Sequence, residues 1–276
     1  MDFHKLIKEF ENCPCGQKHE CAIGDIRIGS GITADTGEIL KENNFPKRIL
    51  LVADKITLKA ADGIEESLRG FETELLIYDT LRVATMADVK RIEGYLDRGI
   101  GGVLAVGTGS VHDICRLACA NRGKPLCLFA TAASMDGFAS YSAPIVDNNF
   151  KITYPAKCPE VIIADTKILA AAPKALKSAG LGDMAAKYVA LIDWRVSNLL
   201  SGESYCERVA ALTEYAADAV MRMADQITAD DEAAAAKVFE GLLLTRIAMS
   251  FTKTSRPRRG CAHITAHHME CNELLD

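Results

Sequence analysis

Apolar residues follow two different patterns along this chain. Between residues 47 and 165, short and nearly continuous apolar runs alternate with amphipathic stretches of helical spacing. The runs are rich in branched side chains and predict buried strands at 47–54, 73–79, 101–107, 124–131 and 161–165. The amphipathic stretches predict helices at 56–71, 85–99 and 111–123. This alternation indicates an α/β fold whose parallel sheet is covered by helices on both faces.

The rest of the chain differs from this central part. Residues 1–45 show no regular period and are predicted to be irregular, and residues 143–160 predict an extended segment or hairpin. From Thr166 onward the sequence is Ala-rich and amphipathic, which predicts helices at 184–200, 205–227 and 231–252. We therefore expect an α/β domain at 1–163 and an α-helical domain at 164–276, without a flexible linker between them.

Composition narrows the class of protein. The 276 residues are 49% apolar and 25% charged, which suits a globular protein with a sizeable core. A net charge of −5 gives no reason to expect nucleic acid or an anionic membrane as a partner. No apolar run approaches the ~20 residues of a membrane span, and the first residues mix Lys and Glu rather than forming a signal peptide. The ten cysteines are scattered, so we expect free thiols in the cytoplasm.

A glycine loop follows the third predicted strand. It comprises Gly107, Thr108, Gly109 and Ser110 and leads directly into a predicted helix. Glycines at such a turn let backbone amides approach a pyrophosphate, and the N-terminus of the helix adds positive potential. His112 stands where the third glycine of a dinucleotide-binding fingerprint would be, so a tight turn without a ligand stays open.

Two further segments lie at the ends of predicted strands. Asp54 ends the first strand, where its carboxylate could accept a hydrogen bond from a ribose hydroxyl or cap the next helix. Residues 131–140 combine small polar side chains with Asp136, and such a segment could face the nicotinamide end of a cofactor or form an ordinary turn.

One constellation suggests a metal. Asp183 is expected where a loop becomes a helix, and His263 and His267 are four positions apart, so that they share one helical face. A carboxylate with imidazole nitrogens suits zinc or another divalent metal, and three protein ligands with an open position would make the site catalytic. The basic residues 255–260, just before His263, could bind a substrate phosphate or form a solvated loop.

A second group of metal-binding residue types lies near the N-terminus. Cys13, Cys15, His19 and Cys21 are closely spaced, but no second pair of ligands follows them. The sequence leaves two interpretations open: a structural zinc site, or thiols in a turn.

Four segments together resemble the glycerol-1-phosphate dehydrogenase family, which belongs with glycerol dehydrogenases, iron-containing alcohol dehydrogenases and dehydroquinate synthases. They read VGTGSVHD, TAASMDGFAS, GLGDMAAKYVALIDW and SRPRRGCAH. The resemblance runs from about residue 47 to the end of the sequence. It implies a Rossmann-like nucleotide-binding domain followed by an all-α metal-binding domain, in a dehydroquinate synthase-like fold, with a homodimer as the expected assembly.

The resemblance also implies roles for single residues. Gly107, Gly109, Ser110 and Val111 would hold the pyrophosphate, with Thr108 in the same loop. Other parts of the cofactor would contact Asp54, Thr131, Ser134 and Ser140. Asp136 and His267 would contact the substrate, His263 would bind the metal, and Asp183 would do both.

The sequence departs from the family pattern in two places. Ala262 stands where an acidic residue usually precedes the first metal histidine, and the third metal histidine of the family would fall beyond Asp276. We therefore expect either a fragment or a short version that uses His267 or His268 as the third ligand or has lost the metal. Helices missing from the second domain would leave apolar surface exposed.

The activity that the resemblance implies is reversible hydride transfer between NAD or NADP and a small polyol phosphate. The substrates would be dihydroxyacetone phosphate and sn-glycerol 1-phosphate, with zinc, nickel or iron as a Lewis acid. Two alternatives remain: a dehydroquinate synthase-like lyase, and a nucleotide-binding fragment without activity. Asp54 favours NAD, since a carboxylate repels a 2′-phosphate.

Overall fold

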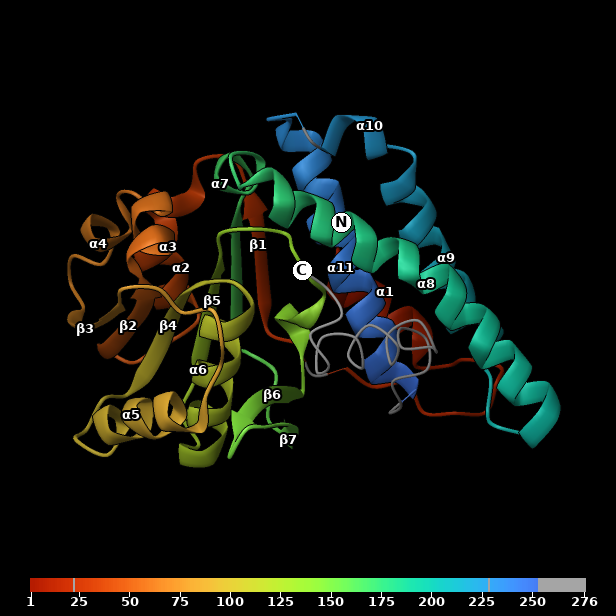
Figure 1. Ribbon diagram of the computed structural model, residues 1–276, viewed down its shortest axis with the longest axis horizontal. Coiled ribbons are helices and arrows are strands. Elements are labelled where there is room, and N and C mark those ends of the chain that lie inside the picture. Colours follow the sequence, from red (N-terminus) through yellow and green to blue (C-terminus); the bar gives the residue numbers. More distant parts are fainter. Residues whose placement is uncertain (22, 228, 253–276) are drawn as a thin grey trace.

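A six-stranded parallel sheet forms the centre of the computed structural model, which describes residues 1–21, 23–227 and 229–252 (Figure 1). Its strands lie in the order β1 (Asp25–Gly29), β8 (Val161–Asp165), β5 (Leu126–Ala130), β4 (Gly102–Gly107), β2 (Arg48–Asp54) and β3 (Glu72–Tyr78). The predicted α/β class is confirmed, as are the five predicted strands.

Helices cover both faces of the sheet. One face carries α5 (Met86–Leu96) and α6 (Gly109–Arg122), and the other carries α2 (Thr36–Glu42), α3 (Lys55–Ala60) and α4 (Ile64–Ser67). Alternate residues of a strand point to opposite faces. Leu50 and Val52 of β2 accordingly pack with α5 and α6 on one face, and Ile49 and Leu51 pack with the helices of the other face. All four side chains are fully buried, which explains the continuous apolar run in the sequence.

Two predictions about local structure are wrong. The expected helix at 56–71 is instead the pair α3 and α4, with an interruption between Ala60 and Ile64. Gly63 in this interruption has a φ of +85°, which residues with a side chain rarely adopt. Residues 1–45 are not irregular, because they contain α1 (Phe3–Phe10), β1 and α2. Among the described strands, β1 pairs with β8 alone, at the edge of the sheet, and it carries Asp25 and Arg27. It therefore lacks the apolar run that identified the buried strands.

The order of the strands places a change of winding direction at the carboxyl ends of β2 and β4. The chain passes from β2 outward to β3, and then returns to the other side of β2 as β4. Ligands of open α/β sheets bind at such a point, where the direction of winding changes. Asp54 ends β2 and Gly107 ends β4, so the fold itself brings these two predicted site residues to neighbouring positions.

Residues 142–155 form the predicted hairpin, with β6 (Ser142–Asp147) antiparallel to β7 (Phe150–Pro155). Asn148 and Asn149 occupy its turn with φ of 48° and 65°, a conformation that asparagine tolerates better than most residues. Ala143 and Ile145 of β6 join the apolar cluster of α5 and α6. The hairpin therefore covers one end of that layer.

From Thr166 onward the described chain is helical, as predicted, although the single helix expected at 205–227 is interrupted after Met221. It comprises α7 (Thr166–Ala170), α8 (Lys174–Ser201), α9 (Glu207–Met221), α10 (Ala224–Ile227) and α11 (Glu232–Thr252). The long α8 lies beside α9 and α11 at one side of the sheet, on the right in Figure 1. Phe3 and Phe10 of α1 are buried in the same apolar cluster as these helices.

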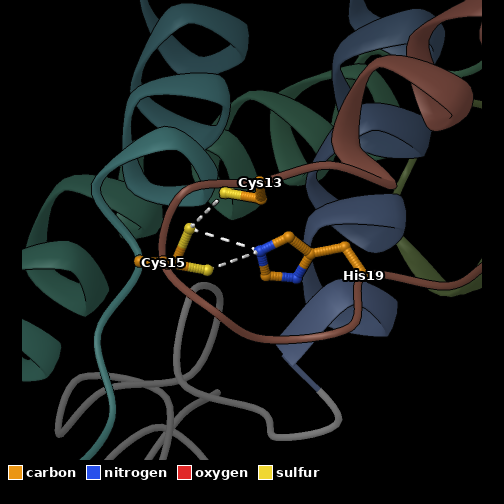
Figure 2. Close-up of side chains that lie close together, drawn as sticks. Cys13, Cys15 and His19 are labelled. Carbon is orange, nitrogen blue, oxygen red and sulfur yellow. Dashed lines mark hydrogen bonds between the residues drawn. The ribbon is translucent and has the colours of Figure 1, made fainter.

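The N-terminal helix therefore packs with the C-terminal half, although β1 belongs to the sheet. After α1, residues 11–21 form a loop beside the helices, which Figure 2 shows around Cys13, Cys15 and His19. The chain thus crosses between sheet and helices near residue 25 as well as near residue 165. The division into domains at residue 163 stays a prediction.

One face of α8 is apolar and exposed. Ile192, Val196 and Leu199 recur at helical spacing and are 63%, 45% and 71% exposed, and Leu200 is 83% exposed. That helices missing from the second domain leave this surface exposed stays a prediction. Among the described residues, no helix is both long enough and apolar enough to span a membrane.

Two glycines inside α8 differ in what surrounds them. A Cβ at Gly180 would lie 1.9 Å from the carbonyl oxygen of Ala133, whereas a Cβ at Gly182 would meet nothing within 4 Å. Gly180 thus lets α8 pack directly on residues 131–140. The helix begins at Lys174, so the expectation that Asp183 lies where a loop becomes a helix is wrong. The two glycines led to the prediction of a loop, because glycine is unfavourable inside helices.

This pair of glycines gives a matched test of the contact. Gly180→Ala should lower the free energy of unfolding by about 1–3 kcal/mol, because the new methyl group forces α8 away from residues 131–140. Gly182→Ala should raise it by about 0.5–1 kcal/mol, since alanine loses less entropy in a helix than glycine. Urea unfolding of the two variants measures both effects. Equal stability changes in the two variants would contradict the close approach at Gly180.

Candidate active site

The glycine loop joins the end of β4 to the start of α6. Thr108 is the N-cap residue, yet its side chain forms no capping hydrogen bond to α6. Gly109 has a φ of +35°, and a Cβ there would meet nothing within 4 Å. The first amides of a helix have no partner within the helix, and together with the helix dipole they attract anions. The start of α6 is therefore an open position at which a phosphate can approach the backbone.

Two cavities lie on either side of this loop. One, of about 540 Å³, is lined by Gly109 and Ser110 and by the basic side chains of Arg82 and Lys151. The other, of about 460 Å³, is lined by Thr108 and by the apolar or basic residues Ile56, Lys59, Lys167, Ile168 and Leu176. Asp113 also lines the first cavity, so the glycine loop separates a polar cavity with two basic residues and one acidic residue from a mainly apolar one. An elongated anionic ligand with an apolar end would fit this arrangement.

Asp54 has the geometry of a helix cap. Its carboxylate accepts hydrogen bonds from the amides of Ile56 and Thr57, at 3.0 and 2.8 Å, and from the amide of Leu81 at 3.4 Å. The Thr57 hydroxyl also lies 3.1 Å from the Asp54 amide, which completes a capping box. Of the two roles that the sequence left open, capping is the one that these contacts fulfil. A contact of Asp54 with a cofactor stays a prediction.

His112, at the position of the missing third glycine, is a core residue. It is fully buried, and its ring packs edge-on against Phe138 with the ring centroids 5.6 Å apart. Burial, together with the nearby Arg116 charge, lowers the pKa of His112 from 6.5 to about 3. The imidazole is therefore neutral at physiological pH. Val111 beside it is also buried, with a side chain in the apolar cluster of α6.

Residues 131–140 lie directly against the glycine loop. The amide of Thr131 donates to the carbonyl oxygen of Gly107 at 2.9 Å. The hydroxyls of Ser134 and Thr108 are 3.0 Å apart and form a hydrogen bond. Thr131 also lines the apolar cavity together with Thr108. The structure thus brings together the predicted residues of both segments, although they are more than twenty positions apart in the sequence.

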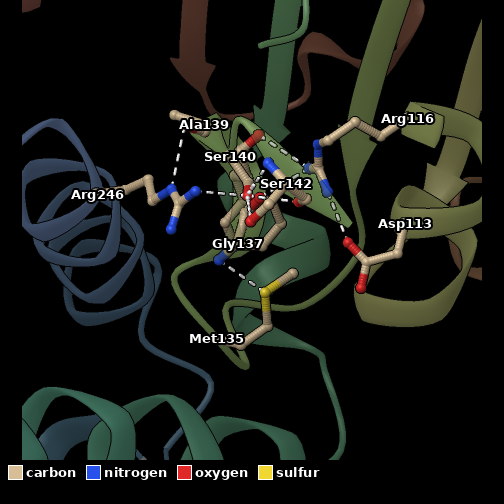
Figure 3. A network of polar contacts seen from close by, with 9 residues as sticks. Asp113, Arg116, Met135, Gly137, Ala139, Ser140, Ser142 and Arg246 are labelled. Atoms are coloured by element: carbon tan, nitrogen blue, oxygen red, sulfur yellow. Dashed lines mark hydrogen bonds and ion pairs between the residues drawn. The ribbon is translucent and has the colours of Figure 1, made fainter. Parts of the chain in front are cut away.

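Two buried arginines hold the end of this segment from opposite sides (Figure 3). Arg116 of α6 donates to the carbonyl oxygens of Gly137 and Phe138, at 2.7 and 3.2 Å, and pairs with Asp113 at 2.6 Å. Arg246 of α11 donates to the Ser140 hydroxyl at 2.6 Å.

Ser140 is itself only 4% exposed, and its hydroxyl donates to the carbonyl oxygen of Ser142 at 2.6 Å. The described contacts of this hydroxyl are therefore within the protein. Its predicted contact with the cofactor is not tested by them.

A lysine connects the two carboxylates that the sequence singled out. The Lys187 ammonium, on α8, lies 3.0 Å from Asp136 and 2.7 Å from Asp183. Lys187 and Asp136 are fully buried, whereas the Asp183 side chain is 18% exposed. Asp183 also accepts a hydrogen bond from the amide of Asp136 at 2.9 Å. One positive charge thus faces two negative charges where α8 meets residues 131–140.

Three of the four candidate metal ligands near the N-terminus lie close together, as the sequence suggested. Cys13, Cys15 and His19 converge (Figure 2). Cys206, a residue that the sequence did not single out, joins them, and the ligand atoms of all four lie within 4.8 Å of one another. Cys21 lies apart, with its sulfur 4.0 Å from the Tyr141 hydroxyl.

Some predicted residues lie outside the described part of the chain. They are His263, His267 and His268, and the basic residues 255–260. The described residues therefore test neither the histidine part of the metal site nor the basic loop.

Sequence reasoning missed Lys187, Arg116 and Arg246. A weak signal was present for the first, because Lys187 is four positions after Asp183 and so shares its helical face. The arginines occur in amphipathic helices, where a surface position would be the ordinary expectation.

Comparison with known proteins agrees with this architecture. Residues 27–173 match the family described as iron-containing alcohol dehydrogenase. The NADH-dependent butanol dehydrogenase A of Thermotoga maritima has a similar structure, with a TM-score of 0.73 at 18% identity, over 91% of this chain and 68% of that one. A probable glycerol dehydrogenase of Sinorhizobium meliloti gives a TM-score of 0.69 at 18% identity, over 84% and 68% of the two chains. Similarity at this level of identity supports the fold.

Closer relatives are found by sequence. A glycerol-1-phosphate dehydrogenase [NAD(P)+] of Thermococcus kodakarensis is 35% identical over 256 residues, which are 91% of this chain and 72% of the relative. The enzyme of the same name from Halalkalibacterium halodurans is 32% identical over 266 residues, 94% of this chain and 66% of the relative. The chain thus spans about two thirds of the length of these relatives. It belongs to the glycerol-1-phosphate dehydrogenases, within the iron-containing alcohol dehydrogenase family.

Proposed function

We propose that this protein is an NAD(P)-dependent and metal-dependent oxidoreductase that interconverts dihydroxyacetone phosphate and sn-glycerol 1-phosphate. One observation carries the proposal: residues 131–140 touch the glycine loop through Ser134 and touch α8 through Asp136. A single short segment therefore connects the predicted phosphate site with Asp183. Hydride transfer needs cofactor and substrate side by side, and this segment lies between the positions proposed for them.

The chain's own residues fit a dinucleotide. Gly109 leaves open space at the start of α6, so that backbone amides can contact a pyrophosphate. Ser110 and the basic residues Arg82 and Lys151 line the cavity on one side of the loop, where phosphate charge would be stabilised. The apolar cavity on the other side, with Thr108 and Thr131 in its wall, suits an uncharged ring. Lys59 and Lys167 also line that cavity, so we expect both NAD and NADP to bind.

The fit to a divalent metal rests on Asp183 within the described residues. Its carboxylate is partly exposed beside residues 131–140 and is the type of ligand that zinc accepts. His263 would be a second ligand, and His267 would contact the substrate. When bound, the cofactor supplies hydride chemistry and the metal supplies a Lewis acid for the reacting oxygen.

Lys187 would position this part of the site. Its ammonium offsets the charge of Asp136 and Asp183, which would otherwise repel each other across a buried contact. Asp136 would thereby stay ordered for contact with a substrate hydroxyl. The helix α8 keeps Asp183 in place through the close approach at Gly180. The expected homodimer and cytoplasmic location stay predictions.

The activity can be tested directly. The purified 276-residue chain, supplied with zinc or nickel, should oxidise NADH and NADPH when dihydroxyacetone phosphate is added. A chelator should abolish this turnover, because the Lewis acid is removed. Absorbance of the reduced cofactor follows the reaction, with a sugar-acid phosphate as the substrate of a dehydroquinate synthase-like lyase in parallel. Binding of NADH without turnover under any metal would contradict the proposed activity.

Asp183→Asn tests the metal ligand. The variant should lose one equivalent of metal per chain and roughly 10²- to 10⁴-fold in turnover, since a Lewis acid contributes several kcal/mol at the transition state. Asp193→Asn is a matched control on the same helix and should keep both metal and turnover. Metal analysis and the cofactor assay provide the two measurements. An Asp183→Asn variant with full metal content would show that the assigned role is wrong.

Lys187→Met tests the buried charge group. The variant should be less stable by about 3–5 kcal/mol, because two carboxylates are then left without their shared cation. A second substitution, Asp136→Asn, should restore part of that stability when it is combined with Lys187→Met, since it removes one of the opposing charges. Urea unfolding of both single variants and of the double variant completes the cycle. Additive destabilisation would mean that Lys187 and Asp136 are not coupled.

A further inference from the structure

Three cysteines and a histidine converge on the side of the helices that faces the N-terminal loop. Cys13 and Cys206 have their sulfur atoms 3.6 Å apart. The Nε2 atom of His19 lies 3.1 Å from the sulfur of Cys15 and 3.4 Å from that of Cys206. Figure 2 shows Cys13, Cys15 and His19 on one loop, with their side chains pointing toward one another.

The separations match a tetrahedral metal centre. Tetrahedral zinc with Zn–S bonds of about 2.3 Å and Zn–N bonds of about 2.0 Å has S···S edges of about 3.8 Å and S···N edges of about 3.5 Å. The S···S distance of 3.6 Å and the S···N distances of 3.1 and 3.4 Å lie close to these edges. All four ligand atoms lie within 4.8 Å of one another.

The orientation of the His19 ring gives a second observation. Its Nδ1 atom lies 2.8 Å from the carbonyl oxygen of Phe251. A carbonyl oxygen only accepts hydrogen bonds, so Nδ1 is the donor of this pair. Nε2 is the nitrogen that faces the sulfur atoms of Cys15 and Cys206. A ligand histidine whose other nitrogen donates to a backbone carbonyl is the usual arrangement around zinc.

The surroundings suit a structural metal site. His19 and Cys206 are each 1% exposed and Cys13 is 9% exposed, while Cys15 lies at the surface. Phe10 and Phe251 stack with centroids 4.7 Å apart, and the His19 ring lies within 6.0 Å of both. This apolar shell excludes water from the buried side. Cys206 is also the N-cap residue of α9.

We propose that Cys13, Cys15, His19 and Cys206 form a structural zinc site, separate from the metal proposed at Asp183. Four protein ligands leave no open position for a substrate, which distinguishes such a site from a catalytic one. The site would fasten residues 11–21, which form neither helix nor strand, to the start of α9. Through His19 it would also fasten them to the end of α11. Cys21, the fourth ligand that the sequence suggested, is replaced by a residue almost two hundred positions later.

The experiment uses the full chain, purified with a reducing agent and without a chelator. Asp183→Asn serves as the background, so that the two metals are counted separately. In this background, elemental analysis should find one zinc per chain. Cys206→Ser and His19→Ala should lose that zinc, whereas Cys21→Ser should keep it as the matched control on the same loop. Equal zinc content in the Cys206→Ser and Cys21→Ser variants would overturn the proposal.

A measurement on the unsubstituted chain covers the case in which a variant does not fold. The chain is produced in cells grown with cobalt in place of zinc. The purified protein should then show the near-ultraviolet charge-transfer absorption of thiolate-bound cobalt, which a carboxylate and histidine site does not produce. The proposal would be wrong if this absorption were absent. It would also be wrong if Cys13 and Cys206 formed a disulfide in the freshly purified, reduced protein, as peptide mass spectrometry would detect.

Because the count is made with Asp183 replaced, it is independent of the proposed dehydrogenase activity. A chain with zinc at the cysteines but no turnover would support the structural site and contradict the function. Turnover of the unsubstituted chain without zinc at the cysteines would support the function and contradict the structural site.

Discussion

Three buried cations hold residues 131–140 in place, and the candidate site depends on them. Arg116, Lys187 and Arg246 come from α6, α8 and α11, and each reaches a carbonyl, carboxylate or hydroxyl oxygen of this segment. A buried charge without partners is costly, so each helix is tied to the segment by the need to satisfy its own cation. The segment in turn is fixed from three directions. The conformation of residues 131–140 therefore depends on contacts with three helices as well as on the segment's own sequence.

This arrangement explains how distant parts of the chain form one site. The parallel sheet places the glycine loop at a change in winding direction, and Ser134 joins it to the neighbouring segment. The same segment receives α8 at Gly180, where no side chain stands between helix and backbone. One turn further along α8, Asp183 meets the amide of Asp136. A small residue at a close approach thus determines where a carboxylate comes to lie.

The sequence predicted what depends on local pattern and missed what depends on distant contacts. The buried strands were recognisable because each is apolar on both faces, whereas β1 was missed because an edge strand can carry Asp25 and Arg27. The start of α8 was missed because Gly180 and Gly182 are typical of loops, and only the neighbouring Ala133 carbonyl explains the first of them. Local spacing links Lys187 with Asp183, but it cannot indicate the contact of Lys187 with Asp136, 51 residues away, or that of Cys206 with Cys13, 193 residues away. Motifs close in sequence, such as the glycine loop, were placed correctly at a strand end.

The edge position of β1 has a consequence for synthesis on the ribosome. Its partner β8 begins at Val161, so β1 emerges more than a hundred residues before the strand that completes its hydrogen bonds. The partners of Cys13 and His19 are synthesised later still, because they are Cys206 and Phe251. The beginning of the chain is made first but docks late, after strands β2 to β5 can already have paired. Until then its thiols and its strand edge are open to solvent, to oxidants and to other nascent chains.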